Sequence, residues 1–204
     1  MQTSDPSSPL TPSSPSPSPS PSSSSPSPSP SSSSPSPSLP FLLEPVRTPE
    51  QIKKTAELAE IIWTEHYTPL IGAAQVAYMI EKFQSVSAVT AQIRQGYRYY
   101  LMQSGGISAG YTAVLSEPME KSLFLSKIYV EKSYRGRHFT SKTLAALKKI
   151  CREEDLEKIR LTVNKGNHSS LAVYEHLGFV QVQDIVTDIG EGYVMDDYIM
   201  EMTI

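Results

Sequence analysis

A short basic loop near the middle of the chain has the residue types of an anion-binding site. Arg135 and Arg137 flank Gly136 there, between a strand pattern and a helix pattern. The first N–H groups of a helix have no partner inside the helix, and the helix dipole makes that end positive. Such a junction binds anions, and the two arginines add positive charge. The loop therefore predicts a site for a phosphorylated cofactor.

Asn167 and Tyr174 form a second group with chemical potential. A tyrosine hydroxyl can act as a general acid that donates a proton to a leaving group. Tyr174 also precedes Leu177 by three residues, so its ring can instead pack in a core. Asn167 suits either a ligand contact or the start of a helix. From the residue types alone, both alternatives stay open for both residues.

Two regular elements must position the basic loop. Residues 122–130 are rich in β-branched and aromatic side chains, which predicts a strand. Residues 140–154 carry one apolar helical face, formed by Leu144, Leu147, Ile150 and Cys151. The cysteine on this face is expected to be a buried structural thiol rather than a nucleophile.

The remaining patterns alternate in the manner of a mixed sheet. Further strands are predicted at residues 41–46, 97–103, 107–115, 158–163, 180–188 and 193–204. Further helices are predicted at residues 49–66, 73–83, 87–95 and 169–177. Hairpins on either side of a central strand-loop-helix-strand unit predict a mixed α/β (α+β) domain.

Composition divides the chain of 204 residues into two parts. Residues 1–40 hold 13 of the 17 prolines and are otherwise almost all serine, so we expect a disordered tail. Residues 41–204 have the length of one domain. The net charge of −3, without a broad basic face, argues against a nucleic-acid partner.

The sequence also lacks several kinds of signal. No stretch approaches the ~20 apolar residues of a membrane span, and no leader pattern is present. We therefore expect a cytoplasmic protein without a membrane partner. No group of His, Cys and Asp residues has metal-ligand spacing, so we predict no metal.

The basic loop also resembles a nucleotide-binding P-loop. Residues 136–143 fit the pattern G-x-x-x-x-G-K-S/T except that Ser141 replaces the second glycine. That glycine lets the backbone approach phosphates closely. Antiparallel hairpins, rather than parallel strands, are predicted before the loop. A nucleotide-binding domain is therefore the less favoured alternative.

The second half of the chain resembles the GNAT superfamily of acetyl-CoA-dependent N-acetyltransferases. The family pattern Q/R-x-x-G-x-G/A begins at Arg135, with His138 in place of the glycine and Thr140 in place of the last small residue. Thr140 also has the side chain of a helix cap. The family pattern N-x-x-A-x-x-x-Y-x-x-x-G-F is met at Asn167, Tyr174, Gly178 and Phe179, with Ser170 for the alanine. The resemblance covers most of residues 41–204.

This resemblance implies a GNAT-like fold, with a central, mostly antiparallel sheet of six or seven strands flanked by helices. It implies acetyl-CoA as co-substrate. The acetyl group would pass directly to a primary amine of a small molecule or peptide in a ternary complex. A catalytically silent acetyl-CoA-binding module is the alternative, and a homodimer is left open.

The resemblance also implies roles for single residues. The loop backbone would hold the CoA pyrophosphate through Arg137, His138, Phe139, Thr140 and Ser141, next to Arg135 and Gly136. The strand end would pair with pantetheine and polarise the thioester carbonyl through Ile128, Tyr129 and Val130. Asn167 would bind pantetheine, and Tyr174 would protonate or hydrogen-bond the leaving thiolate. The general base is left among Glu65, His66, Asp196, Asp197 and water.

Overall fold

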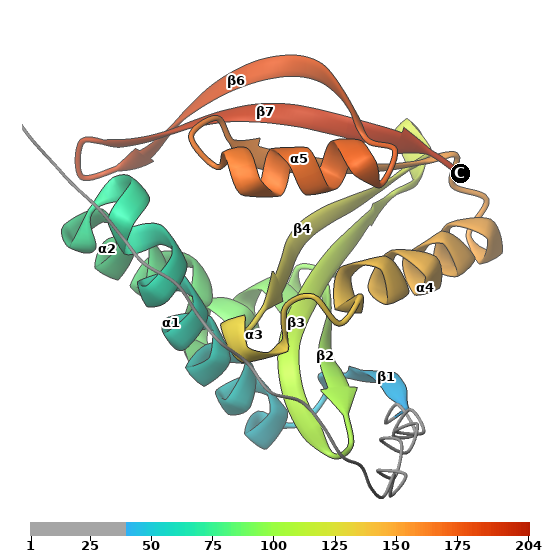
Figure 1. The fold of residues 1–204 in the computed structure, drawn as a ribbon, viewed down its shortest axis with the longest axis horizontal. Helices are drawn as coiled ribbons and strands as arrows, with labels where there is room; N and C mark the ends of the chain where they lie inside the picture. The colour runs from blue at the N-terminus through green and yellow to red at the C-terminus, as the bar shows by residue number, and fades with distance from the viewer. Residues whose placement is uncertain (1–39) are drawn as a thin grey trace, which may run out of the picture. The chain divides into compact units, whose positions relative to one another are not determined.

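The computed structural model describes residues 40–204, so all but the last residue of the expected tail lies outside the described residues. The described part forms one sheet in the order β1-β2-β3-β4-β5-β7-β6 (Figure 1). Its strands are β1 (Phe41–Pro45), β2 (Arg98–Ser104), β3 (Ile107–Glu117), β4 (Ser122–Val130), β5 (Lys158–Asn164), β6 (Val180–Gly190) and β7 (Tyr193–Thr203). Every neighbouring pair is antiparallel except β4 with β5. The predicted fold class, with a mostly antiparallel sheet of six or seven strands, is confirmed.

Helices cover both faces of this sheet (Figure 1). They are α1 (Pro49–Ile71), α2 (Ala73–Gln84), α3 (Val86–Arg94), α4 (Phe139–Glu153) and α5 (His168–His176), with short 3-10 turns η1 (Pro118–Glu120) and η2 (Lys132–Tyr134). Helices α1–α3 pack with β2 and β3 in one apolar core. Helices α4 and α5 pack with β4, β5 and β7 in another, which buries Cys151 as predicted. Among the described helices, none has the length and apolar character needed to cross a membrane.

The first helix is longer than the sequence predicted. We expected it to end near His66, before Pro69, but α1 continues to Ile71 with the proline in its last turn. Proline there removes one backbone hydrogen bond, and the Gly72 N–H still closes the turn onto the Thr68 carbonyl at 3.0 Å. The predicted end was wrong because a single lost bond near a terminus does not stop a helix that is packed along its length. The extension brings one more helical turn to the site described below.

Strands β4 and β5 pair briefly and then separate. Their parallel register ends at Phe124↔Arg160, the third pair. A bulge follows at once in β4, with Ser126 as the extra residue opposite β3. A bulge bends the strand that contains it. From Leu125 to Val130, β4 therefore has no strand neighbour on its β5 side.

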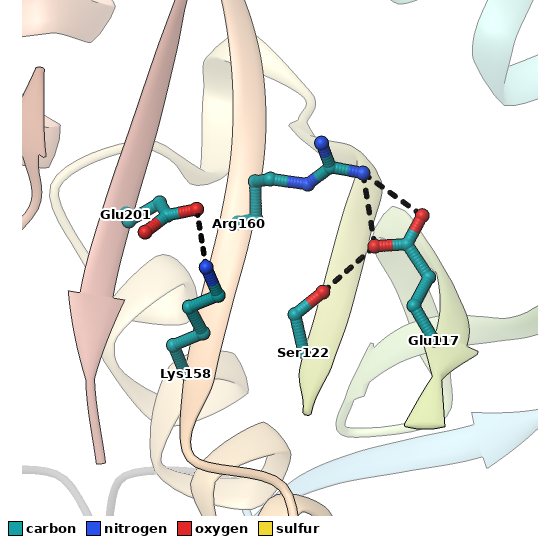
Figure 2. Close-up of polar contacts among 5 residues, drawn as sticks. All are labelled: Glu117, Ser122, Lys158, Arg160 and Glu201. Atoms are coloured by element: carbon teal, nitrogen blue, oxygen red, sulfur yellow. Dashed lines mark hydrogen bonds and ion pairs between the residues drawn. The ribbon is translucent and has the colours of Figure 1, made fainter. Parts of the chain in front are cut away.

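A polar network fastens the end at which these strands still pair (Figure 2). Arg160 of β5 donates to both carboxylate oxygens of Glu117 on β3, each at 2.9 Å, and so reaches across β4. The same carboxylate accepts from the Ser122 hydroxyl of β4 at 2.7 Å. Lys158 of β5 pairs with Glu201 of β7 at 2.8 Å. Side chains from four neighbouring strands thus close the gap at this end and leave the other end open.

Candidate functional site

The gap between β4 and β5 opens into a cavity of about 1020 Å³. Its lining comes from α1–α3, the separated parts of β4 and β5, the loop before α4, α5, and the β6–β7 hairpin. All the predicted cofactor-binding residues except Arg137 line it, as does Tyr174. The Arg137 guanidinium instead donates to the Ser133 carbonyl at 3.3 Å and lies over the Tyr134 ring.

The basic loop enters α4 through two residues with left-handed backbone. Gly136 has a φ of 75°, and His138, the N-cap, has a φ of 61°. Histidine is one of the residues enriched in that region, which explains how it can replace the glycine of the motif. The first helical bond joins the Lys142 N–H to the His138 carbonyl at 3.0 Å. The N–H groups of residues 139–141 therefore have no partner within the helix, at the positive end of its dipole.

The cap of this helix differs from the sequence prediction. Thr140 does not cap α4, because the left-handed turn at His138 starts the helix at Phe139 and no side chain accepts a capping bond there. Arg135 lies in the same loop and lines the cavity, and its Nε donates to the Val130 carbonyl at 3.1 Å. The loop thus combines unpartnered donors with a fixed positive charge.

The separated end of β4, residues 128–130, pairs with β3 on one side and faces the gap on the other. A free strand edge presents N–H and C=O groups to an extended ligand. The Tyr129 ring fixes this end, with centroids 5.5 Å from Trp63, 6.3 Å from Tyr67 and 5.3 Å from Tyr111. The strand edge is therefore rigid on its aromatic side and open on the side of the gap.

Asn167 is the N-cap of α5 and is 3% exposed. Its Oδ1 accepts from the Ser170 N–H at 3.2 Å and from the Ser169 hydroxyl at 3.1 Å. Its amide nitrogen lies 3.1 Å from Nε2 of His66. The helix-start interpretation of this asparagine is therefore correct, and the residue also faces the cavity.

Tyr174, in the last turn of α5, combines both of its proposed interpretations. Its ring packs edge-on against Phe179, with centroids 5.7 Å apart. The residue also lines the cavity. Burial raises the pKa of its hydroxyl, and the neighbouring Tyr67 raises it further. The hydroxyl is therefore a neutral hydrogen-bond donor across the physiological pH range.

Comparison with known proteins decides the family. Residues 55–179 match the family model described as the acetyltransferase (GNAT) family. The chain belongs to the GNAT acetyltransferase family. No curated protein matches the chain closely enough to be counted as a relative.

Solved GNAT structures share its fold. The PaiA N-acetyltransferase of Thermoplasma acidophilum, in complex with coenzyme A, is 17% identical with a TM-score of 0.66, over 81% of this chain and 100% of the other. A GCN5-related N-acetyltransferase of Rhodopseudomonas palustris is 14% identical with a TM-score of 0.67, over 82% and 96%. The ribosomal-protein-S18-alanine N-acetyltransferase of Escherichia coli is 16% identical with a TM-score of 0.60, over 80% and 94%. At these identities the likeness shows the fold alone.

As a GNAT acetyltransferase, the chain uses acetyl-CoA as co-substrate, and the nucleotide-binding alternative is set aside. The residues present fit this molecule. The open N–H groups of residues 139–141 and the guanidinium of Arg135 suit its pyrophosphate. The free edge of β4 suits the amides of its pantetheine arm.

The structure divides the candidate general bases of this GNAT site into two kinds. Glu65 and Asp196 are each held by a lysine, at 2.9 Å and 2.7 Å, and neither lines the cavity. His66 and Asp197 both line it. They approach from the end of α1 and from β7, on opposite sides of the gap.

Asp197 and His66 differ in their readiness to accept a proton. Asp197 is 5% exposed, and this burial raises its carboxyl pKa to about 6. Burial and the nearby Arg135 guanidinium both lower the pKa of the His66 imidazole. Because Oδ1 of Asn167 is already an acceptor, its amide nitrogen donates to Nε2 of His66. The histidine lone pair is therefore engaged, whereas burial raises the proton affinity of the Asp197 carboxylate.

The cavity is also lined by residues to which sequence reasoning assigned no role, among them Tyr67, Gln92 and Lys127. Tyr67 was missed because α1 was expected to end before it. Lys127 is a charged residue inside the strand pattern of residues 122–130, but nothing in the sequence indicates that it is buried. The structure places its ammonium against Oε1 of Gln92 at 2.7 Å.

Proposed function

We propose that this GNAT domain moves the acetyl group of acetyl-CoA directly to a primary amine while both substrates are bound. One observation carries the proposal: a single cavity is lined by the loop before α4 and also by α1–α3 and the β6–β7 hairpin. Substrates that enter from these two sides meet at the separated end of β4. Cys151, 0% exposed on the buried face of α4, does not line the cavity, which favours direct transfer over an acyl-enzyme.

Positioning supplies most of the rate acceleration in this scheme. The N–H groups of residues 139–141 and the Arg135 guanidinium bind the pyrophosphate. The free edge of β4 aligns the pantetheine arm, and one of its N–H groups donates to the thioester carbonyl. A donor aimed at the developing oxyanion contributes about 3 kcal/mol to transition-state stabilisation.

Two side chains handle the charges that develop. An amine is mostly protonated at neutral pH and has no lone pair in that form, so the Asp197 carboxylate first accepts one proton from the ammonium. The free amine then attacks the thioester carbon, and the second proton, lost as the C–N bond forms, passes to the departing thiolate to give CoA. The Tyr174 hydroxyl donates a hydrogen bond to the sulfur as the C–S bond breaks. The raised pKa of this hydroxyl favours a hydrogen bond over full proton transfer.

The identity of the amine is not decided by the fold. One structural neighbour is by its name a ribosomal-protein-S18-alanine N-acetyltransferase, and another is a spermidine N-acetyltransferase chimera. These two acceptors differ greatly in charge, so the acceptor of this chain must be sought in its own cavity residues.

The test is thiol release from acetyl-CoA by the purified chain, measured against a panel of amines. We expect amine-dependent release with a sequential kinetic pattern, in which both substrates must bind before CoA leaves. A chain that binds acetyl-CoA but releases no thiol with any amine would support the silent-module alternative. A ping-pong pattern would contradict direct transfer.

A further inference from the structure

We call the side of the cavity that is lined by α1–α3 and the β6–β7 hairpin the acceptor side. It contains a buried lysine with no acidic partner among the described residues. Lys127 lies on β4, 6% exposed, and lines the cavity. We propose that Lys127 forms a subsite for a carboxylate group on the acceptor, so that the acceptor is an amine that also carries a carboxylate, such as an amino acid. This inference rests on the proposed function, because it concerns the second substrate of the same cavity.

The contacts of Lys127 leave its charge uncompensated. Its Nζ donates to Oε1 of Gln92 at 2.7 Å and lies 3.4 Å from the Ser126 hydroxyl. Its ammonium also lies 5.9 Å and 5.4 Å from the ring centroids of Tyr97 and Tyr99. An ammonium has three donors, and each of these neighbours is neutral. Within residues 40–204, Lys127 forms no ion pair.

Burial of such a charge is unfavourable unless it is paired. Desolvation lowers the pKa of Lys127 to about 8, so at neutral pH most of the population is still charged. A carboxylate that binds there replaces the lost hydration with an ion pair and fills the remaining donor. The buried Lys127 ammonium therefore costs stability while it is unpaired, and it gains a favourable ion pair when a carboxylate binds.

The other charged residues of the cavity are consistent with an acceptor that carries both a positive amine and a negative carboxylate. Asp197 is the one carboxylate among the described lining residues, and it lies across the gap from Lys127. Lys82 also lines the cavity, but its Nζ is occupied by the Tyr78 hydroxyl at 2.8 Å and by the Ile189 carbonyl. An amino acid would thus present its amine toward Asp197 and its carboxylate toward Lys127. A polycation would be bound less well, because the described lining of the cavity offers it one carboxylate, Asp197, and two lysines that repel it.

The position of Lys127 along β4 suits a short acceptor. Lys127 and Tyr129 lie on the same face of the strand, two residues apart, which is about 7 Å. The thioester is expected beside residues 128–130. The proposed acceptor therefore reaches from the thioester to the Lys127 ammonium beside Gln92, and acceptors of different lengths test this span.

The experiment uses the full chain and matched acceptor pairs, each an amino acid and its amide, in which a neutral carboxamide replaces the carboxylate. Glycine, β-alanine, 4-aminobutyrate, L-methionine and L-phenylalanine cover different lengths and side chains. We expect at least one pair in which kcat/KM is tenfold or more higher for the carboxylate. In the Lys127→Met variant this ratio should fall below threefold, through loss of activity toward the carboxylate.

Lys82→Met is the matched control, since it removes the other cavity lysine and should leave the ratio unchanged. Titration calorimetry of the same pairs against the chain saturated with CoA gives a second readout. There the carboxylate should bind at least tenfold more tightly, and Lys127→Met should remove the difference. Equal affinity for both members of every pair would overturn the subsite, with or without turnover.

These outcomes separate the two proposals. Acetylation of amines with no preference for a carboxylate overturns the subsite and leaves the transferase function standing. Carboxylate-dependent binding without acetyl transfer keeps the subsite and overturns the transferase function. If Lys127→Met does not fold, as judged by its thermal transition, Lys127→Gln takes its place, and a ratio that survives in this variant also overturns the subsite.

Discussion

The amide nitrogen of Asn167 lies 3.1 Å from Nε2 of His66, and this contact joins the start of α5 to the end of α1 across 101 residues of sequence. The two elements come from opposite faces of the sheet. They meet where β4 and β5 have separated. A cap residue thus also connects the cofactor side of the cavity to its acceptor side.

This dual role gives the first prediction. Asn167→Ala should lower the free energy of unfolding by about 1 kcal/mol through loss of the cap, and it should also raise the KM for acetyl-CoA. Thermal unfolding and initial-rate kinetics measure the two effects. The control is Ser85→Ala, which removes the cap of α3 from the Ala88 N–H and is far from the loop before α4. It should cost similar stability and leave KM unchanged; an equal rise in KM would refute the specific role.

Tyr174→Phe tests the hydrogen bond to the leaving thiolate. We expect kcat to fall by roughly 10²-fold, at the low end for a group of this kind. The melting temperature should change little, because the ring keeps its packing on Phe179. Tyr100→Phe removes a hydroxyl from the same apolar core without touching the cavity, and its kcat should match that of the parent chain. Similar losses in both variants would leave Tyr174 without a catalytic role.

The pH dependence of the reaction follows from Asp197. Its carboxyl pKa of about 6 predicts that kcat/KM rises with pH through that value, as the carboxylate becomes available. Asp197→Asn should lower kcat/KM and remove this ascending limb. A limb that persists in the variant would assign the base to another group, with His66 as the next candidate.

The same raised pKa makes a separate prediction about stability. Above about pH 6 the carboxylate is charged in both the folded and unfolded chains, so its burial costs stability in full; below its ordinary pKa of 3.8 it is neutral in both and costs nothing. Asp197→Asn should therefore be more stable than the parent at pH 8, with a difference that shrinks below about pH 6 and disappears by about pH 3. Chemical unfolding at the two pH values measures it, and a destabilised variant at pH 8 would contradict the prediction.

His138 gives a prediction about backbone strain. Its φ of 61° costs a non-glycine residue roughly 1 kcal/mol or more. His138→Gly should be neutral or stabilising by up to about 1 kcal/mol, since the entropy lost by glycine offsets part of the relief. His138→Val, which is β-branched, should be destabilised by about 1–2 kcal/mol. Unfolding by denaturant checks the order, and equal stability in both variants would exclude strain at this position.

We also propose that residues 41–204 form an independent domain, as the composition indicates. Strand β1 begins at Phe41 and pairs with β2 over its whole length. A chain that begins at residue 39 should keep its melting temperature within about 2 °C, which corresponds to less than 1 kcal/mol for a domain of this size. A larger fall would assign the preceding residues a part in the fold.

Local patterns predicted most of the elements. Period-two and helical spacing placed the strand Ser122–Val130 and the helix that follows, because their apolar residues repeat within one element. Two motifs also predicted the family, since Asn167 and Tyr174 keep their spacing on α5. The end of α1 was wrong because Pro69 was weighed without the tertiary packing that outweighs one lost bond.

Local sequence patterns could not predict which distant segments pair or which side chains they bury. The insertion of β7 between β5 and β6 depends on long-range pairing, and it is this insertion that brings Asp197 beside Asn164. In the sequence, Asp196 and Asp197 are equivalent. Because successive side chains of β7 point to opposite faces, Asp196 forms an exposed ion pair with Lys165, whereas the Asp197 carboxylate is buried. The burial of Lys127 has the same origin, because it depends on Gln92 from another element.

The brief pairing of β4 with β5 has a consequence for how the domain unfolds. Within the sheet, strands β1–β4 and strands β5–β7 are joined by three backbone pairs and the Arg160–Glu117 contact (Figure 2), while the apolar core of α4 and α5 spans both groups. A co-substrate lying along the free edge of β4 therefore acts as a missing strand between two blocks. Amide hydrogen exchange should then report two separate opening events in the free protein and one concerted event when acetyl-CoA is bound.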